Sequence, residues 1–179
     1  MRTFFIMLQK IIFFKRLVPS ILRRLPFKTR NIKIENFKIH LNLESTIDRY
    51  IYLKGFYDRE KINFFENKID LNQFDYFLDI GSNIGFYSLY LASKYKNLNI
   101  MAFEPIYENY TQIEKSVEMN NFKKINVYKY ALSNKKDKQI MWTTDLKKKG
   151  GFSVFDDKDY LNEIEINNYD SNKIFKKSI

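Results

Sequence analysis

The segment FLDIGSNIGFYSLYLA, residues 77–92, decides the fold because its pattern changes twice within a short stretch. Its apolar beginning predicts a buried strand over 75–80. Two glycines then mark a loop over 81–85, since glycine permits the sharp backbone turn that joins a strand to a helix. Apolar residues at a spacing of four follow and predict a helix over 86–95. The segment therefore predicts a strand, a glycine loop and a helix in direct succession.

The next residues repeat this alternation. LNIMAFEP (98–105) predicts a second strand, IYENYTQIEKSVEMN (106–120) a second helix, and INVYKYAL (125–132) a third strand. The order β-α-β-α-β is typical of a parallel sheet with right-handed crossovers. The predicted fold class is therefore α/β, with part of a doubly wound, Rossmann-like sheet.

Shorter elements flank this unit on both sides. Before it, the pattern predicts two short strands within 31–44 that turn near Asn36. A helix over Ile47–Lys54 is expected next, with Ser45 or Thr46 as its N-terminal cap and Gly55 at its end. A second helix is expected from Asp58 to about Lys68. After it, the pattern predicts a strand over 136–144, a turn at Gly150–Gly151 and a short strand over 162–167.

Composition and these elements divide the chain into four parts. They are a basic amphipathic arm (1–30), a strand and helix lead-in (31–73), the β-α-β-α-β unit with its later strands (74–166) and a polar tail (167–179). The chain has 179 residues, which suffices for one domain. It contains no cysteine and one histidine, so disulfides, thiolate sites and a His-rich metal site are excluded and no metal is predicted. The abundance of Ile, Lys and Asn indicates an A/T-rich, bacterial genome.

Most of the net charge of +10 lies in the N-terminal arm, where the first acidic residue is Glu35. The basic residues of the arm are Arg2, Lys10, Lys15, Arg16, Arg23, Arg24, Lys28 and Arg30. On a helical wheel most of them lie opposite an apolar face that contains Met7, Val18, Ile21 and Leu22. Pro19 does not fit inside one continuous helix, but it suits the first turn of a second helix.

Three partners suit an arm of this kind. A helix lying on an anionic membrane surface and a helix packed on its own domain are both expected to show this amphipathic pattern. Nucleic acid is a weaker third alternative, because the aromatic residues lie on the apolar face rather than among the charges. Basic and polar residues interrupt the apolar run, so neither a transmembrane span nor a signal peptide is predicted. The expected location is the cytoplasm, with peripheral contact at the inner face of the membrane.

The glycine loop and Glu104 together predict a nucleoside site. Glu104 ends the strand after the loop, 19 residues beyond Gly85. Ligands of doubly wound sheets bind over the carboxyl ends of the strands, where an acid in this place accepts both ribose hydroxyls. The loop lacks the Gly-Lys-Ser/Thr of a P-loop and the spacing of a dinucleotide motif. The adjacent Asp79 repels a pyrophosphate, so a cationic ligand with a ribose and no phosphate is favoured, namely S-adenosylmethionine.

Two motifs in this unit resemble those of a known family. Asp79-Ile-Gly81-Ser82-Asn83-Ile-Gly85 is similar to the Asp-x-Gly-Ala-Asn-x-Gly motif of the FkbM family of class I S-adenosylmethionine-dependent methyltransferases, with Ser82 where alanine is usual. Phe103-Glu104-Pro105 matches the second hallmark of that family. The resemblance covers roughly residues 47–145 and includes the helical lead-in GFYDREKINFFENKI (55–69).

The resemblance implies a role for each residue of the motifs. Asp79 and the loop residues Gly81, Ser82, Asn83 and Gly85 would face the methionine part of the cofactor, Glu104 would hold the ribose, and Ala131 and Leu132 would border the adenine. Pro105 belongs to the same set of cofactor-binding residues. Asn83 also suits a helix cap, a role compatible with ligand binding. The residues supply no evident general base, so no catalytic residue is assigned.

Family membership implies methyl transfer to a hydroxyl of a sugar or of a polysaccharide or glycolipid precursor. An RNA methyltransferase is a second alternative, suggested by the positive charge. The family's fourth strand, with its acidic motif, does not follow in this sequence, so an inactive or partner-dependent truncated remnant that binds the cofactor weakly is a further alternative. In that case the first strand of the sheet would present an uncovered edge, and self-association through this edge is expected.

Overall fold

A three-stranded parallel sheet forms the centre of the molecule. Its strands are β3 (Tyr76–Ile80), β4 (Asn99–Phe103) and β5 (Ile125–Tyr128), in the order β3-β4-β5. Helix α5 (Phe86–Lys94) connects β3 to β4, and α6 (Tyr107–Asn120) connects β4 to β5. The β-α-β-α-β order and the parallel pairing confirm the predicted α/β fold class.

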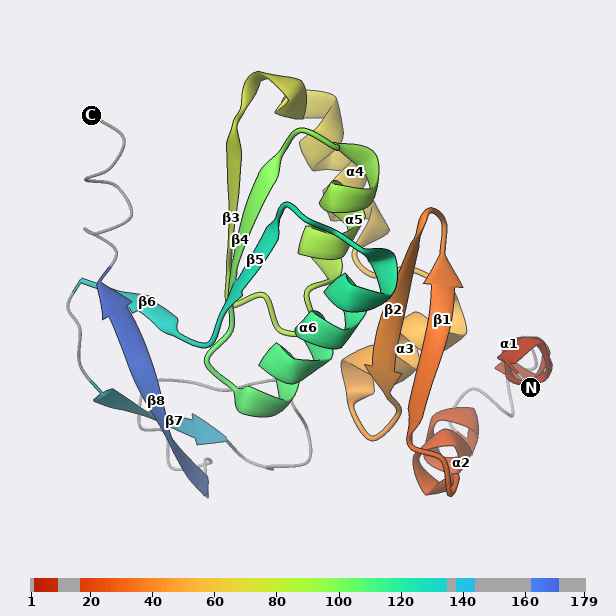
Figure 1. Cartoon of the computed structure of the whole chain (residues 1–179). Helices are drawn as coiled ribbons and strands as arrows, with labels where there is room; N and C mark the ends of the chain where they lie inside the picture. The colour runs from red at the N-terminus through yellow and green to blue at the C-terminus, as the bar shows by residue number, and fades with distance from the viewer. Residues whose placement is uncertain (1, 10–16, 135–137, 144–161, 171–179) are drawn as a thin grey trace.

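The computed structural model describes residues 2–9, 17–134, 138–143 and 162–170. Within them, α4 (Arg59–Lys68), α5 and α6 lie on one side of the parallel sheet in Figure 1. Buried Ile100 and Ala102 of β4, Leu89 of α5 and Ile113 of α6 contribute to the core. These positions explain the apolar spacing in the sequence, because residues on one helix face and alternate strand residues meet in the same layer.

The lead-in segment folds as the sequence predicts. Strands β1 (Thr29–Ile34) and β2 (Phe37–Asn42) form an antiparallel hairpin that turns at Glu35–Asn36. Helix α3 (Thr46–Lys54) follows; the Ser45 hydroxyl accepts a hydrogen bond from the backbone N–H of Asp48 at its start, and Gly55 ends it with a φ of 78°. Strand β2 packs against α6, and Figure 1 shows the hairpin on the far side of that helix from the sheet.

The described part of the N-terminal arm forms two short helices. These are α1 (Arg2–Gln9) and α2 (Leu17–Arg24), and Pro19 lies in the first turn of α2 as predicted. The guanidinium Nε of Arg2 donates to the carbonyl oxygen of Tyr52 at 2.8 Å, which ties α1 to α3. No helix within the described ranges has both the length and the apolar character that crossing a bilayer requires.

A second, mixed sheet lies next to the carboxyl ends of the parallel strands (Figure 1). Its strands are β6 (Ala131–Ser133), β7 (Lys138–Thr143) and β8 (Asn162–Asp170), in the order β6-β8-β7. The prediction of one continuous strand over 125–132 is therefore wrong. The chain leaves the parallel sheet after Tyr128, and Ala131–Ser133 pairs with β8 instead.

The later elements agree with the sequence in part. Strand β7 confirms the expected strand within 138–143, and β8 begins at the expected position. Strand β8 continues through Asp170, into the segment expected to be a polar tail, because Asn168 is buried and pairs with Ala131. The expected turn at Gly150–Gly151 and the end of the tail over 171–179 lie outside the described residues.

Candidate functional site

The glycine loop is held against the end of the neighbouring strand. The backbone N–H groups of Gly81 and Ser82 both donate to the carbonyl oxygen of Phe103, at 2.9 and 3.0 Å. Gly81 and Gly85 both have a φ of +72°, and Asn83 has a φ of 52°. The left-handed backbone at these positions explains why the loop needs glycines and tolerates asparagine between them.

Glu104 lies at the carboxyl end of β4 and is only 5% exposed. One carboxylate oxygen, Oε2, accepts a hydrogen bond from the backbone N–H of Asn83 at 2.8 Å. The other, Oε1, accepts from the backbone N–H of Ile106 at 3.0 Å and from the side-chain amide of Asn109 at 3.4 Å. The carboxylate thus connects the glycine loop to the start of α6, and its position is fixed from both sides.

A pocket of about 290 Å³ opens between this loop, the end of β4 and the second sheet. It brings together six residues that the sequence predicted for the cofactor, which are Gly81, Asn83, Glu104, Pro105, Ala131 and Leu132. The remaining lining residues are Ile80, Ile106, Asn109 and Met141. The volume is near the lower end of the range for small-molecule sites.

The other three predicted residues lie beside this pocket and do not line it. Asp79 accepts a hydrogen bond from the Ser88 hydroxyl at 2.6 Å and lines an adjoining apolar cavity of about 460 Å³, which shares Ile80 with the pocket. The Ser82 hydroxyl donates to the Phe103 carbonyl at 3.3 Å, and Gly85 precedes the first residue of α5. Ser82 and Gly85 shape the loop, and Asp79 lines the neighbouring cavity.

The site accumulates negative charge in a buried place. Burial raises the pKa of Glu104 to about 7, against the lowering effect of its three hydrogen bonds, and the nearby charge of Asp79 adds to the increase. Burial also raises the pKa of Asp79, opposed by its bond to Ser88. Within the ranges that the structure describes, no ion pair joins either carboxylate to a basic side chain. The pair therefore favours a ligand that brings positive charge and hydrogen-bond donors.

Asn83 offers a further acceptor at the same place. Its side-chain oxygen Oδ1 is buried and has no hydrogen-bond partner in the described part of the chain. The cap of α5 is Gly85, without a side-chain cap bond, so the alternative role of Asn83 as a helix cap is wrong. A buried carbonyl oxygen without a donor costs free energy, and a ligand N–H group would satisfy it.

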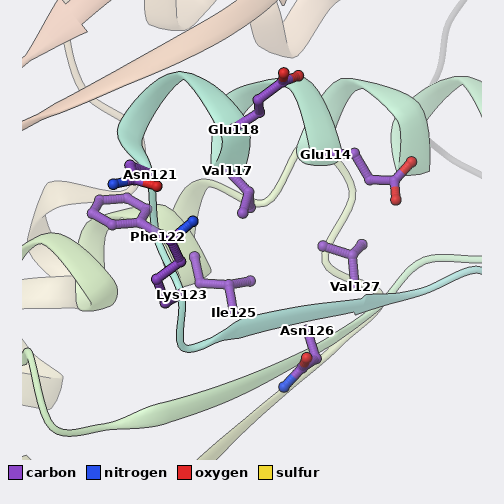
Figure 2. Close-up of a pocket in the computed structure, with 9 residues that line it drawn as sticks. All are labelled: Glu114, Val117, Glu118, Asn121, Phe122, Lys123, Ile125, Asn126 and Val127. Carbon is purple, nitrogen blue, oxygen red and sulfur yellow. The ribbon is translucent and has the colours of Figure 1, made fainter.

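A larger cavity of about 540 Å³ lies elsewhere, between α6 and β5. Figure 2 shows Val117 of α6 across the gap from Ile125 and Val127 of β5. This cavity starts at the amino end of β5, whereas ligands of parallel sheets bind over the carboxyl ends. It contains neither the glycine loop nor a buried acid, so the smaller pocket at Glu104 is the better candidate site.

No family model matches the sequence, and no curated protein matches it. Two of the solved structures that are similar to part of this chain are methyltransferases. One is the tRNA (uracil-54, C5)-methyltransferase of Pyrococcus abyssi in complex with S-adenosyl-L-homocysteine, at 15% identity and a TM-score of 0.41, covering 58% of this chain and 24% of that one. The other is coclaurine N-methyltransferase bound to N-methylheliamine and S-adenosylhomocysteine, at 23% identity and a TM-score of 0.34, covering 67% of this chain and 36% of that one.

The two likenesses concern the fold alone. This chain spans about a quarter of the first solved chain and about a third of the second. Both TM-scores are below 0.5, so neither likeness assigns an activity or a ligand to this chain.

Sequence reasoning missed four lining residues of the pocket. Asn109 had a detectable signal, because it lies about one helical turn after Glu104 and is a polar residue that α6 buries. Ile80 and Ile106 directly flank the two motifs, so their place follows from the motifs' position. Met141 comes from β7, whose place depends on pairing with β8, and no local pattern predicts that contact.

The raised pKa of Glu104 predicts a pH-dependent stability. In the unfolded chain Glu104 loses its proton near pH 4.5, but in the folded chain only near pH 7. Between these values the folded state binds more protons, so the free energy of unfolding falls as pH rises from about 4.5 to about 7 and then stays level. The expected Glu104 contribution is on the order of 3 kcal/mol.

Urea unfolding at pH 5 and pH 8 measures this effect in the wild type and in Glu104→Gln, which keeps an acceptor and removes the titration. We expect the variant to lose less stability between pH 5 and pH 8 than the wild type does. A smaller pH dependence remains in the variant, because the pKa of Asp79 is also raised. Glu108→Gln on the exposed face of α6 is the control and keeps the wild-type dependence. An unchanged pH dependence in Glu104→Gln would show that Glu104 is not buried as a charged group.

Proposed function

We propose that this chain binds S-adenosylmethionine in the pocket at Glu104 and transfers its methyl group to an acceptor. The observation that carries the proposal is the pair of buried carboxylates at the ends of the adjacent strands β3 and β4. Both have a raised pKa, and no basic residue of the described chain pairs with them. A ligand with two ribose hydroxyls, an ammonium group and a sulfonium complements such a site.

The residues of the site fit this cofactor part by part. The Glu104 carboxylate would accept the ribose hydroxyls, and the orphan Oδ1 of Asn83 suits an N–H donor. A Cβ added at Gly81 would meet no atom within 4 Å, so the backbone there is open to a ligand. Pro105 and Leu132 give the pocket apolar lining for a purine. When bound, S-adenosylmethionine supplies an electrophilic methyl group.

The acceptor class rests on the motif resemblance. The Asp79–Gly85 motif and the Phe103-Glu104-Pro105 triplet resemble the FkbM family, whose members methylate hydroxyl groups of sugars. We therefore propose a hydroxyl of a sugar, or of a polysaccharide or glycolipid precursor, as the acceptor. The contribution of this chain would be to hold the acceptor oxygen in line with the methyl group, since positioning accounts for much of the acceleration in such transfers.

Isothermal titration calorimetry tests the cofactor. We expect S-adenosylhomocysteine to bind at least about tenfold more tightly than NAD, because the pyrophosphate would lie against the buried acids. Adenosine alone should bind more weakly than S-adenosylhomocysteine, since it lacks the ammonium group. Equal or tighter binding of NAD would reject the proposal in favour of a dinucleotide site.

Transfer of a radioactive methyl group tests the acceptor. The chain is incubated with methyl-labelled S-adenosylmethionine and, separately, with sugar-containing acceptors and with RNA. Label in the sugar fraction supports the proposed acceptor class. Label in RNA alone would leave the cofactor proposal standing and reject the sugar acceptor.

A further inference from the structure

The N-terminal arm has more apolar surface than its own domain covers. Phe5 of α1 and Val18 and Leu22 of α2 are buried, so one face of the arm packs on the domain. The arm also exposes large apolar side chains, each between 42% and 70% exposed, namely Phe4, Met7, Leu17, Ile21 and Phe27. Packing on the domain therefore accounts for one apolar face of the arm and leaves a second one in solvent.

The exposed residues form stripes along the two helices. Phe4 and Met7 are three positions apart in α1, and Leu17 and Ile21 are four apart in α2. Residues at these spacings lie on one face of a helix. Each helix thus has a buried apolar side and an exposed apolar side, an arrangement that a helix with only one partner does not need.

Positive charge lies at the end of α2 and beside Phe27. Arg23 and Arg24 are exposed in the last turn of α2, and the Arg30 guanidinium lies 5.7 Å from the centre of the exposed Phe27 ring. No acidic residue occurs in the arm, and Glu35 is the first in the chain. Lys28 is paired with Glu44, so the charge of the arm itself comes mainly from arginines.

We propose that the exposed apolar residues Phe4 and Met7 of α1 and Leu17 and Ile21 of α2, with Arg23 and Arg24, bind the surface of an anionic lipid bilayer. Apolar side chains that enter the boundary between headgroups and acyl chains, with basic residues at headgroup level, are the features of an interfacial helix. The exposed set is mainly aliphatic, and aliphatic side chains enter a bilayer but offer no stacking surface to nucleic-acid bases. This proposal does not depend on the proposed function, because it concerns different residues.

Co-sedimentation of the full chain with vesicles tests it. Vesicles of phosphatidylcholine with 30% phosphatidylglycerol are compared with vesicles of phosphatidylcholine alone. We expect binding to the anionic vesicles only, and binding that weakens as sodium chloride rises from 50 to 500 mM, because salt screens the attraction. Arg23→Glu/Arg24→Glu should reduce the affinity at least about thirtyfold, since each base near such a surface contributes about fivefold.

The apolar contribution is tested with Phe4→Ser/Ile21→Ser, for which we expect a loss of about tenfold. The matched controls are Phe64→Ser/Tyr76→Ser, two similarly exposed side chains outside the arm, and Lys115→Glu/Lys123→Glu, two exposed bases outside it. Both controls should bind as the wild type does. The proposal would be overturned if the chain bound neutral vesicles as tightly as anionic ones, or if the control variants lost as much affinity as the arm variants. It would also be overturned if the arm bound an RNA oligonucleotide and the chain did not bind vesicles.

Discussion

Replacing Glu104 with alanine is expected to weaken the binding of S-adenosylhomocysteine by about 1.5–3 kcal/mol, or roughly 10- to 150-fold. The carboxylate is buried, lines the pocket and is oriented by the backbone N–H groups of Asn83 and Ile106. Hydrogen bonds from ribose hydroxyls to a carboxylate in such a place are of the strong, charge-assisted kind. Calorimetric titration of the wild type and the variant measures the difference.

Two further variants separate binding from folding. Glu104→Gln keeps one acceptor oxygen, which serves only one of the two backbone N–H groups, and removes the charge, so it should bind with intermediate affinity while remaining folded. Glu108→Ala, on the exposed face of the first turn of α6, should bind as the wild type does. The assignment of Glu104 to the ligand would fail if Glu104→Ala and Glu108→Ala had the same affinity.

Replacing Gly85 with alanine is expected to destabilise the fold by about 2–4 kcal/mol. Its φ of +72° is unfavourable for alanine, and the added Cβ would lie 2.9 Å from Cγ2 of the fully buried Ile113. Helix α6 would have to shift away from α5, which would move the start of α6 away from Glu104. Urea unfolding of the purified variant measures the loss.

Gly81→Ala is the matched comparison for this prediction. Gly81 has the same φ of +72°, but its Cβ would meet nothing within 4 Å. Only the backbone cost of about 1–2 kcal/mol is therefore expected. The double variant Gly85→Ala/Ile113→Ala should be less destabilised than the sum of its two single variants, because removal of the Ile113 branches relieves the overlap. Equal losses for Gly81→Ala and Gly85→Ala, with additive effects in the double variant, would show that Ile113 is not the limiting contact.

The elements that the sequence predicts correctly are those determined by local sequence patterns. The strand, glycine loop and helix over 75–95 follow from an apolar run, two residues that accept left-handed backbone, and an apolar stripe. The same reasoning placed Glu104 beside the loop, because parallel strands end at one edge of their sheet. Gly81, Asn83 and Glu104 of the pocket lining follow from this reasoning, whereas Pro105, Ala131 and Leu132 were implied by the family resemblance.

The remaining features depend on contacts between distant segments. Residues 125–132 have one apolar pattern, but Ala131–Ser133 turns away to pair with β8, which lies about thirty residues later in the chain. Met141 reaches the pocket through the same sheet. In the arm, the sequence shows one apolar face, whereas the structure divides the apolar residues between a buried side with Val18 and an exposed side with Ile21. Which side of α2 is covered is decided by its packing against other elements, α1 among them, and not by the helix itself.

A crystal structure of the full chain with S-adenosylhomocysteine would show whether the pocket at Glu104 is the cofactor site. We expect both ribose hydroxyls within hydrogen-bond distance of the Glu104 carboxylate, the adenine against Pro105 and Leu132, and the ammonium group close to Oδ1 of Asn83. A nucleoside located in the cavity between α6 and β5, or one whose ribose hydroxyls make no contact with Glu104, would contradict this assignment.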